Sequence, residues 1–191
     1  MFARMALAAL LAVTAENLLF AGGAGFSRVL RTARNPRSIG IDSLLIAFFS
    51  MASAFCWLWI GPALPASGPV RTAALAAVSA AVCVVVSGAA RLLTPRLFVR
   101  FGAHLPAAAL NTVVLFVPYA LQGLSAGPAQ AAGFALGTGA AYWIASEAVY
   151  HAADRCGSPD MPKAFAGVPA LLIYVGILSM AFAGFTGGRI F

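Results

Sequence analysis

The chain has 191 residues, of which 62% are hydrophobic and only 9% are charged. A soluble domain of this length could not cover so much apolar surface with so few charges, so the composition indicates an integral membrane protein. The net charge of +7 does not indicate a nucleic-acid partner, because the basic residues lie in short segments between apolar runs and form no clustered basic face. The three cysteines, Cys56, Cys83 and Cys156, include no close pair, which argues against a disulfide scaffold or a thiol metal site.

Six stretches qualify as membrane spans, since a span needs about 20 mainly apolar residues. They cover about residues 6–26, 39–60, 70–93, 103–121, 129–150 and 164–185. All are predicted as helices, because an open sheet edge cannot satisfy its hydrogen bonds in lipid. Met1–Ala15 also has features of a cleavable signal peptide, but the apolar run continues through Leu18-Leu19-Phe20, which favours a retained span.

The first span carries the most unusual residues. Glu16 and Asn17 lie within its apolar run, and Gly22, Gly23 and Gly25 follow. A carboxylate or an amide is costly in hydrocarbon and usually faces a cavity, an ion path or a partner. Glu16 could carry a proton, bind a sodium ion together with Asn17, or simply hydrogen-bond a neighbouring helix.

The six spans divide into two sets of three, about residues 1–95 and 96–191, within a single membrane domain. Because each set has an odd number of spans, the second enters the membrane from the opposite side, as inverted repeats do. The first span of each set contains an asparagine, Asn17 or Asn111, and residues that disturb a helix, the glycines in one and Pro106 and Pro118 in the other. The sequence therefore predicts two broken helices and a midplane ion site formed by Glu16, Asn17 and Asn111, although each asparagine could instead only bond a neighbouring helix.

Basic residues predict the orientation of these spans. Nine of the twelve lie in the segments after spans one, three and five: Arg28, Arg31, Arg34, Arg37, Arg91, Arg96, Arg100, Arg155 and Lys163. The opposite side has Arg4, Arg71 and Arg189. Because short cytoplasmic loops are enriched in Lys and Arg, both termini are predicted to lie outside the cell.

Several segments, taken in order along the whole chain, resemble a known family. They are Glu16-Asn17 with Gly25, the run from Pro95 to Pro106 followed by Asn111, the run from Gly137-Thr138-Gly139 to Asp160-Met161-Pro162, and the closing run Gly176–Phe185. They resemble the A-type component of the Rnf complex and the related membrane subunits of the sodium-translocating NADH:quinone oxidoreductase. The resemblance implies a multi-pass subunit of the bacterial inner membrane that works with other membrane subunits, including an inverted sister subunit.

The same resemblance implies an iron–sulfur cluster shared with the sister subunit, through one cysteine on the first span and one on the fourth. In this sequence those positions are Ser27 and Thr112. Hydroxyls are poor substitutes for the thiolates that hold such clusters. We therefore expect no cluster ligands, no other cofactor and no metal site on this chain.

The leading functional hypothesis is a membrane subunit of an Rnf-type complex that couples electron transfer, of the ferredoxin or NAD class, to Na⁺ or H⁺ translocation. Such a subunit is not catalytic alone. Two alternatives remain open at this stage: a small inverted-repeat secondary transporter with a midplane site, and a degenerate paralogue that serves only as a scaffold. Gly137-Thr138-Gly139 lacks the third glycine and the preceding strand of a dinucleotide fingerprint, so close helix packing explains it better.

Overall fold

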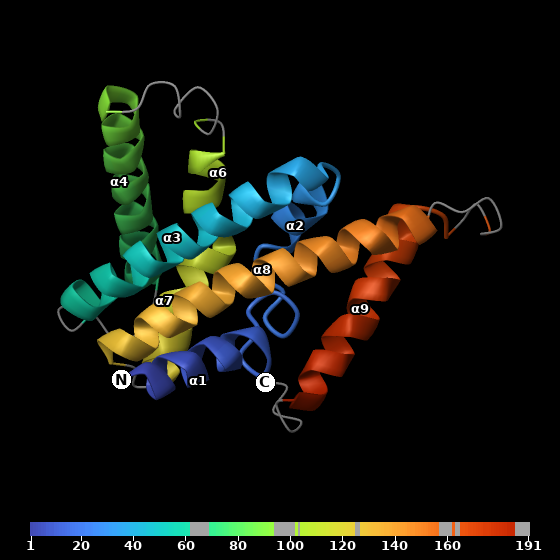
Figure 1. The fold of residues 1–191 in the computed structure, drawn as a ribbon, viewed down its shortest axis with the longest axis horizontal. Coiled ribbons are helices and arrows are strands. Elements are labelled where there is room, and N and C mark those ends of the chain that lie inside the picture. Colours follow the sequence, from blue (N-terminus) through green and yellow to red (C-terminus); the bar gives the residue numbers. More distant parts are fainter. Residues whose placement is uncertain are drawn as a thin grey trace.

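The structure is a computed structural model that describes residues 1–61, 69–93, 102, 104–124, 127–156, 162 and 165–185 (Figure 1). Within these residues every regular element is a helix, as predicted. The predicted basic residues Arg96, Arg100, Lys163 and Arg189 lie outside the described residues.

Four predicted spans correspond to single helices: α3 (Pro36–Ile60), α4 (Pro69–Leu93), α8 (Pro128–Cys156) and α9 (Val168–Phe185). A proline is the first residue of α3, α4 and α8, where the missing N–H has no helical partner and the fixed φ suits a helix start. By length and composition, Pro36–Ile60 and Leu105–Gln122 could each cross a membrane, and shorter apolar helices cover Phe2–Val13, Ala76–Ala89 and Val168–Gly184. The full set of six spans stays a prediction.

The other two predicted spans are interrupted. The first consists of α1 (Phe2–Val13), a stretch of turns, and α2 (Phe26–Thr32), and the fourth consists of α6 (Leu105–Ala109) and α7 (Thr112–Gly123). The predicted break in span one is present, but it begins at Thr14, before Glu16 and Asn17, and not at the glycines that predict it, because α1 ends at Val13. Residues 26–32 are helical rather than part of a loop.

The centre of the fold is the pair α3 and α8, which lie side by side, with α1 along the other side of α8 (Figure 1). A methyl group added at Gly133 or Gly137 would collide with the backbone of Met5 or Ala9 in α1, and one at Gly139 would collide with Ala47 in α3. The small residues of α8 therefore allow close packing, as predicted. These contacts also set the directions: residue numbers increase together in α1 and α8, and they run oppositely in α3 and α8.

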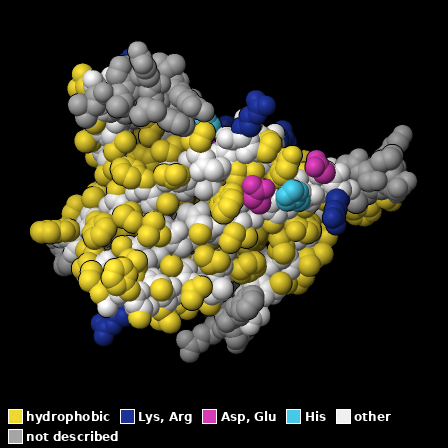
Figure 2. Space-filling model, viewed as in Figure 1, with side chains coloured by type: hydrophobic (Ala, Val, Ile, Leu, Met, Phe, Trp, Pro, Cys, Tyr) yellow, Lys and Arg dark blue, Asp and Glu magenta, His cyan; other side chains and the backbone are white. Residues whose placement is uncertain are grey.

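The remaining helices pack around this centre. α4 and α7 lie against α3, while α9 lies against α8. The Ser179 hydroxyl of α9 donates to the Phe20 carbonyl, and the Phe20 and Phe182 rings stack with centroids 4.8 Å apart. The face drawn in Figure 2 is mostly hydrophobic, with a small group of acidic, histidine and basic side chains on its right half and further basic side chains at its edges. The large hydrophobic side chains that are exposed in the structure include Leu44, Val84 and Met180, as expected for a bundle in lipid or against partner chains.

Candidate functional site

The first helix break spans residues 14–25 and is organised by Asn17. The Asn17 Oδ1 accepts the N–H groups of Leu19 (3.0 Å) and Phe20 (3.1 Å), and its Nδ2 donates to the carbonyl of the last α1 residue (2.8 Å). The side chain thus satisfies backbone groups that the end of α1 leaves open. Gly23 has a φ of 63°, a conformation that costs glycine little.

The second break is made by Asn111, which is extended (φ −69°, ψ 135°) between α6 and α7. Its Oδ1 accepts the Val113 N–H (3.1 Å) and so caps α7. The two prolines that predicted this break do not mark it. Pro106 lies in the first turn of α6, where proline is tolerated, and Pro118 lies inside α7.

The two breaks meet directly. The Gly25 N–H donates to the Thr112 hydroxyl oxygen (2.7 Å). Gly25 has a φ of 70°, and a Cβ there would lie 2.5 Å from Asn111 Oδ1 and collide with Val113. Only glycine satisfies both the backbone conformation and the close approach. Asn111 therefore lies next to Gly25, the residue of the first break that directly precedes α2.

A pocket of about 320 Å³ lies where the breaks meet. Its lining is Ser27, Arg28, Arg31, Ala107, Leu110, Asn111 and Thr112. Ser27 and Thr112, which lie far apart in the sequence, thus share one pocket. No lining residue is acidic. The lining instead carries two guanidinium groups, one amide and two hydroxyls, which are mainly hydrogen-bond donors.

A buried polar network next to this pocket is absent from the sites predicted from the sequence. Asp42 of α3 is 2% exposed, and its Oδ1 accepts from Arg28 Nη2 (3.0 Å) and His104 Nδ1 (2.8 Å). Its Oδ2 accepts from the Thr32 hydroxyl (2.8 Å), whose oxygen lies 3.0 Å from the Tyr142 hydroxyl. Because the Thr32 proton points to Asp42, Tyr142 donates to Thr32.

This network joins four elements: α2, α3, the N-cap of α6 and α8. A buried ion pair costs desolvation and is tolerated when its remaining lone pairs are satisfied, as they are at Asp42. The sequence holds one signal of this network, because Asp42 is a lone carboxylate three residues beyond the predicted start of span two. An ionisable residue inside a span is itself a reason to suspect a functional or structural site.

The structure does not bring the three predicted ion-site residues together in one pocket. Asn111 lines the pocket at the breaks, whereas the hydrogen bonds that Asn17 makes within the described residues all go to the backbone around it. Both asparagines are buried, and Glu16 is exposed. Glu16 therefore lies on the surface of the chain at the first break.

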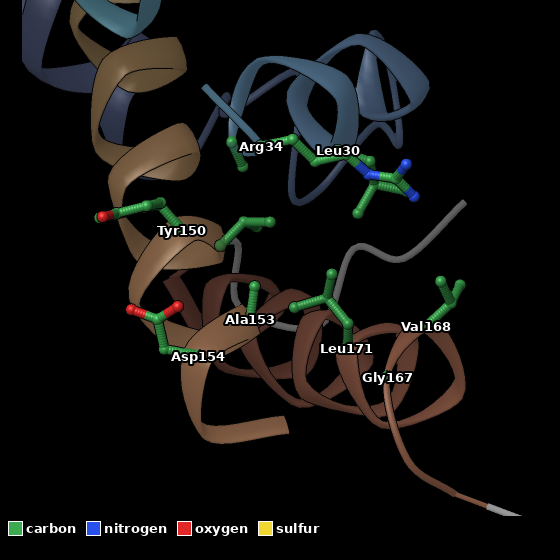
Figure 3. Close-up of a pocket in the computed structure, with 10 residues that line it drawn as sticks. Leu30, Arg34, Tyr150, Ala153, Asp154, Gly167, Val168 and Leu171 are labelled. Carbon is green, nitrogen blue, oxygen red and sulfur yellow. The ribbon is translucent and has the colours of Figure 1, made fainter. Parts of the chain in front are cut away.

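A pocket of about 370 Å³ lies elsewhere, between α2, α8 and the start of α9 (Figure 3). It is mainly apolar, with Leu30, Ala153 and Leu171 around the same space and the charged residues Arg34 and Asp154 in its lining. None of the predicted ion-site or cluster positions lines this pocket.

Comparison with known proteins identifies the family. The family model described as "Rnf-Nqr subunit, membrane protein" matches residues 5–188. The chain belongs to the Rnf-Nqr subunit family. The A-type component of the ion-translocating oxidoreductase complex of Pectobacterium atrosepticum is 30% identical over 166 residues, 85% of this chain and 83% of that protein. The protein of the same name from Rhodobacter capsulatus is 29% identical over 158 residues, 81% of each chain.

The shared iron–sulfur cluster that the Rnf resemblance implies can be tested against the residues present. Ser27 and Thr112 share a pocket, but each offers a hydroxyl, and none of the three cysteines lines that pocket. Cys83 and Cys156 are buried in the apolar core instead. The part of the chain that the structure describes also holds no group of three or more His, Cys, Asp or Glu side chains that could bind a metal ion. This donor set does not fit an iron–sulfur cluster, which thiolates normally hold.

Proposed function

We propose that this Rnf-Nqr family chain is the A-type membrane component of an ion-translocating oxidoreductase complex, in which electron transfer between other subunits drives Na⁺ or H⁺ across the membrane. Relatives that carry the name of that component match this chain over most of their length. The observation that carries the proposal is the contact between two interrupted helices at Gly25 and Thr112. Interrupted helices that meet within a membrane bundle are typical of ion and substrate sites.

We propose that the two halves are inverted repeats. If span one is exchanged with span four, span two with span five and span three with span six, each contact between helices is matched by another contact of the fold. It exchanges the contact of span one with span five (α1 and α2 against α8) for that of span four with span two (α6 and α7 against α3), and α3 against α4 with α8 against α9. It also exchanges the contact of α4 with α6 and α7 for the contact of α9 with the first break. The antiparallel pair α3 and α8 would lie at the two-fold axis.

The proposed setting is the bacterial inner membrane, with six spans and both termini outside. The helix directions support this topology, because spans one and five are parallel and spans two and five are antiparallel. Exposed apolar side chains such as Leu44 and Met180 suit lipid contact.

The proposed partners include an inverted sister subunit that covers the first break. Glu16, Ala21, Gly22 and Gly23 are exposed in the isolated chain, although the backbone there is irregular. Irregular backbone is tolerated at membrane depth only where protein or a water-filled cavity covers it. Another subunit of the complex would provide that cover and would shelter the Glu16 carboxyl from lipid.

Within this arrangement Glu16 is the proposed ion-carrying group, and the two asparagines have a supporting role. Asn17 holds the end of α1 and Asn111 caps α7, so both maintain the breaks that open the path. The ion would pass along the face that this chain shares with its partner. Because Ser27 and Thr112 offer no thiolates, we propose that this chain binds no iron–sulfur cluster of its own.

Two experiments test this function. The first is purification in mild detergent with identification of the accompanying chains and their iron. Flavin- and cluster-bearing partners support the proposal. Solute uptake by the lone chain in liposomes would instead favour a secondary transporter, and stoichiometric iron bound through this chain would refute the absence of a cluster.

The second experiment uses the Glu16→Gln variant of the complex in proteoliposomes. We expect ion uptake driven by electron transfer to fall strongly, while assembly and electron transfer persist. Glu147→Gln is the control, because Glu147 is a partly exposed residue of α8 that lies 3.7 Å from His151 and away from both breaks. Unchanged coupling in Glu16→Gln would exclude Glu16 from the path. If the wild-type complex assembles well but electron transfer drives no ion uptake, a scaffold role is favoured.

A further inference from the structure

Two residues that line the pocket where the breaks meet carry buried donors that lack acceptors. Asn111 is 5% exposed, and its Nδ2 has no hydrogen-bond partner in the described part of the chain. The Arg28 Nε is also buried and unpartnered, although Nη2 of the same side chain bonds to Asp42. Buried donors are rarely left unpaired, because each costs about 1–3 kcal/mol. Both residues line the same pocket.

The rest of the lining adds donors and positive charge. The Thr112 oxygen accepts from Gly25, so its own proton is free to donate elsewhere. Ser27 offers a second hydroxyl. Asp42 balances the charge of Arg28, but Arg31 has no ion-pair partner among the described residues. The pocket therefore keeps a net positive charge and presents donors from both breaks.

A second hollow of about 240 Å³ adjoins this pocket and extends its basic lining. It shares Ser27 and Arg31 with the first and adds Leu30 and Arg34. Arg28, Arg31 and Arg34 are spaced by three residues, which places them near one another on the helical surface. Apolar Leu30 and Leu110, the latter 53% exposed, lie beside these cations.

We propose that this pocket is an anion site that binds a phosphate group, with Arg28, Arg31 and Asn111 as the main donors and Ser27 and Thr112 as supporting hydroxyls. Guanidinium groups suit phosphate because their N–H groups match its oxygens in paired hydrogen bonds. The phosphate comes either from free inorganic phosphate or from the headgroup of an anionic lipid. Basic pockets between membrane helices are known to hold such headgroups.

The test uses two variants of the chain in its purified complex. Asn111→Asp keeps an oxygen that caps α7, because Asp and Asn are about equally good N-caps, but it replaces the free donor with a negative charge. Arg31→Gln removes an exposed cation without disturbing the core. Arg37→Gln is the matched control, because Arg37 is exposed and lines none of the described pockets.

Inorganic phosphate is titrated calorimetrically into the complex in phosphatidylcholine nanodiscs, and co-purified lipids are identified by native mass spectrometry. We expect each site variant to weaken binding at least about tenfold, the size of one lost charge-assisted hydrogen bond. Arg37→Gln should stay near the wild type. If phosphatidylglycerol in the nanodiscs abolishes phosphate binding and is retained by the wild type but not by the site variants, the headgroup is the ligand. If phosphate still binds in nanodiscs that contain phosphatidylglycerol, free inorganic phosphate is the ligand.

The proposal fails if neither phosphate nor anionic lipid binds, or if both site variants bind as the wild type does. If Asn111→Asp does not fold, Arg31→Gln alone decides, because its position is exposed. The result is independent of the proposed ion path, since Glu16 does not line this pocket.

Discussion

The Gly25 N–H and the Thr112 hydroxyl form a hydrogen bond of 2.7 Å across 87 residues of sequence. The bond joins the residue before α2 to the first residue of α7, so it connects the two broken helices at the point where both are interrupted. A functional site at the breaks depends on this contact, because the lining of the pocket comes from both sides of it.

Replacing Thr112 with valine should separate the two breaks. Valine has nearly the same shape as threonine but offers no acceptor to the Gly25 N–H. A part-buried donor without a partner costs about 1–3 kcal/mol. We expect a lower free energy of unfolding, measured from thermal unfolding in detergent. Thr112→Ser keeps the hydroxyl and should recover most of the loss, and equal destabilisation by both variants would contradict this role for the bond.

Gly25→Ala should be more damaging than an ordinary glycine substitution. The φ of 70° costs a residue with a Cβ about 1–2 kcal/mol, and the new methyl group would also collide with Asn111 and Val113. Gly40→Ala is the control, because Gly40 lies in α3 with nothing within 4 Å of an added Cβ. We expect Gly40→Ala to be neutral or stabilising by up to about 1 kcal/mol in the same unfolding assay. Similar midpoints for the two variants would argue against the close contact.

The packing of α1 on α8 should depend on Gly137. A Cβ there would lie 2.8 Å from Ala9 Cα and 2.9 Å from Ala12 Cβ. In Gly137→Ala the gain in helix propensity, about 1 kcal/mol, is opposed by the separation of the two helices. We expect net destabilisation and easier proteolysis near the N-terminus. Gly176→Ala in α9 meets nothing within 4 Å and should gain stability instead. A Gly137→Ala variant as stable as Gly176→Ala would contradict the packing.

Much of this fold follows from apolar length and from helix-ending residues. The starts of α3, α4 and α8 lie within three residues of the expected positions, because Pro36, Pro69 and Pro128 fit the first helical turn. The glycines predict a break in span one, but α1 already ends at Val13, well before Gly22, and Asn17 organises the turns that follow. The second break was expected for the wrong reason, since it arises at Asn111 and not at the prolines. Local residue preference cannot reveal that Gly25 would approach Asn111, because this contact depends on the packing of the whole bundle.

The Asp42 network could not be assembled from the sequence for the same reason. Its five residues come from four elements, and only packing of α2, α3, α6 and α8 brings them together. Ser27 and Thr112 were linked beforehand only through a resemblance to relatives, whereas the pocket they share follows from the two breaks. Pairs of residues distant in sequence are thus the part of the site that sequence patterns did not reveal.

Replacing Asp42 with asparagine should destabilise the fold more than any other charge removal in the described part of the chain. The substitution leaves Arg28, whose side chain is only 17% exposed, without its counter-charge. Loss of one partner of a buried pair costs about 3–5 kcal/mol, and partial exposure of Arg28 and His104 favours the lower end of that range. Thermal unfolding in detergent measures the loss. Glu147→Gln removes a partly exposed carboxylate that is 3.7 Å from His151 and should change stability by less than about 1 kcal/mol. Equal effects of the two substitutions would show that the Asp42 contacts do not hold α2 and α6 against α3.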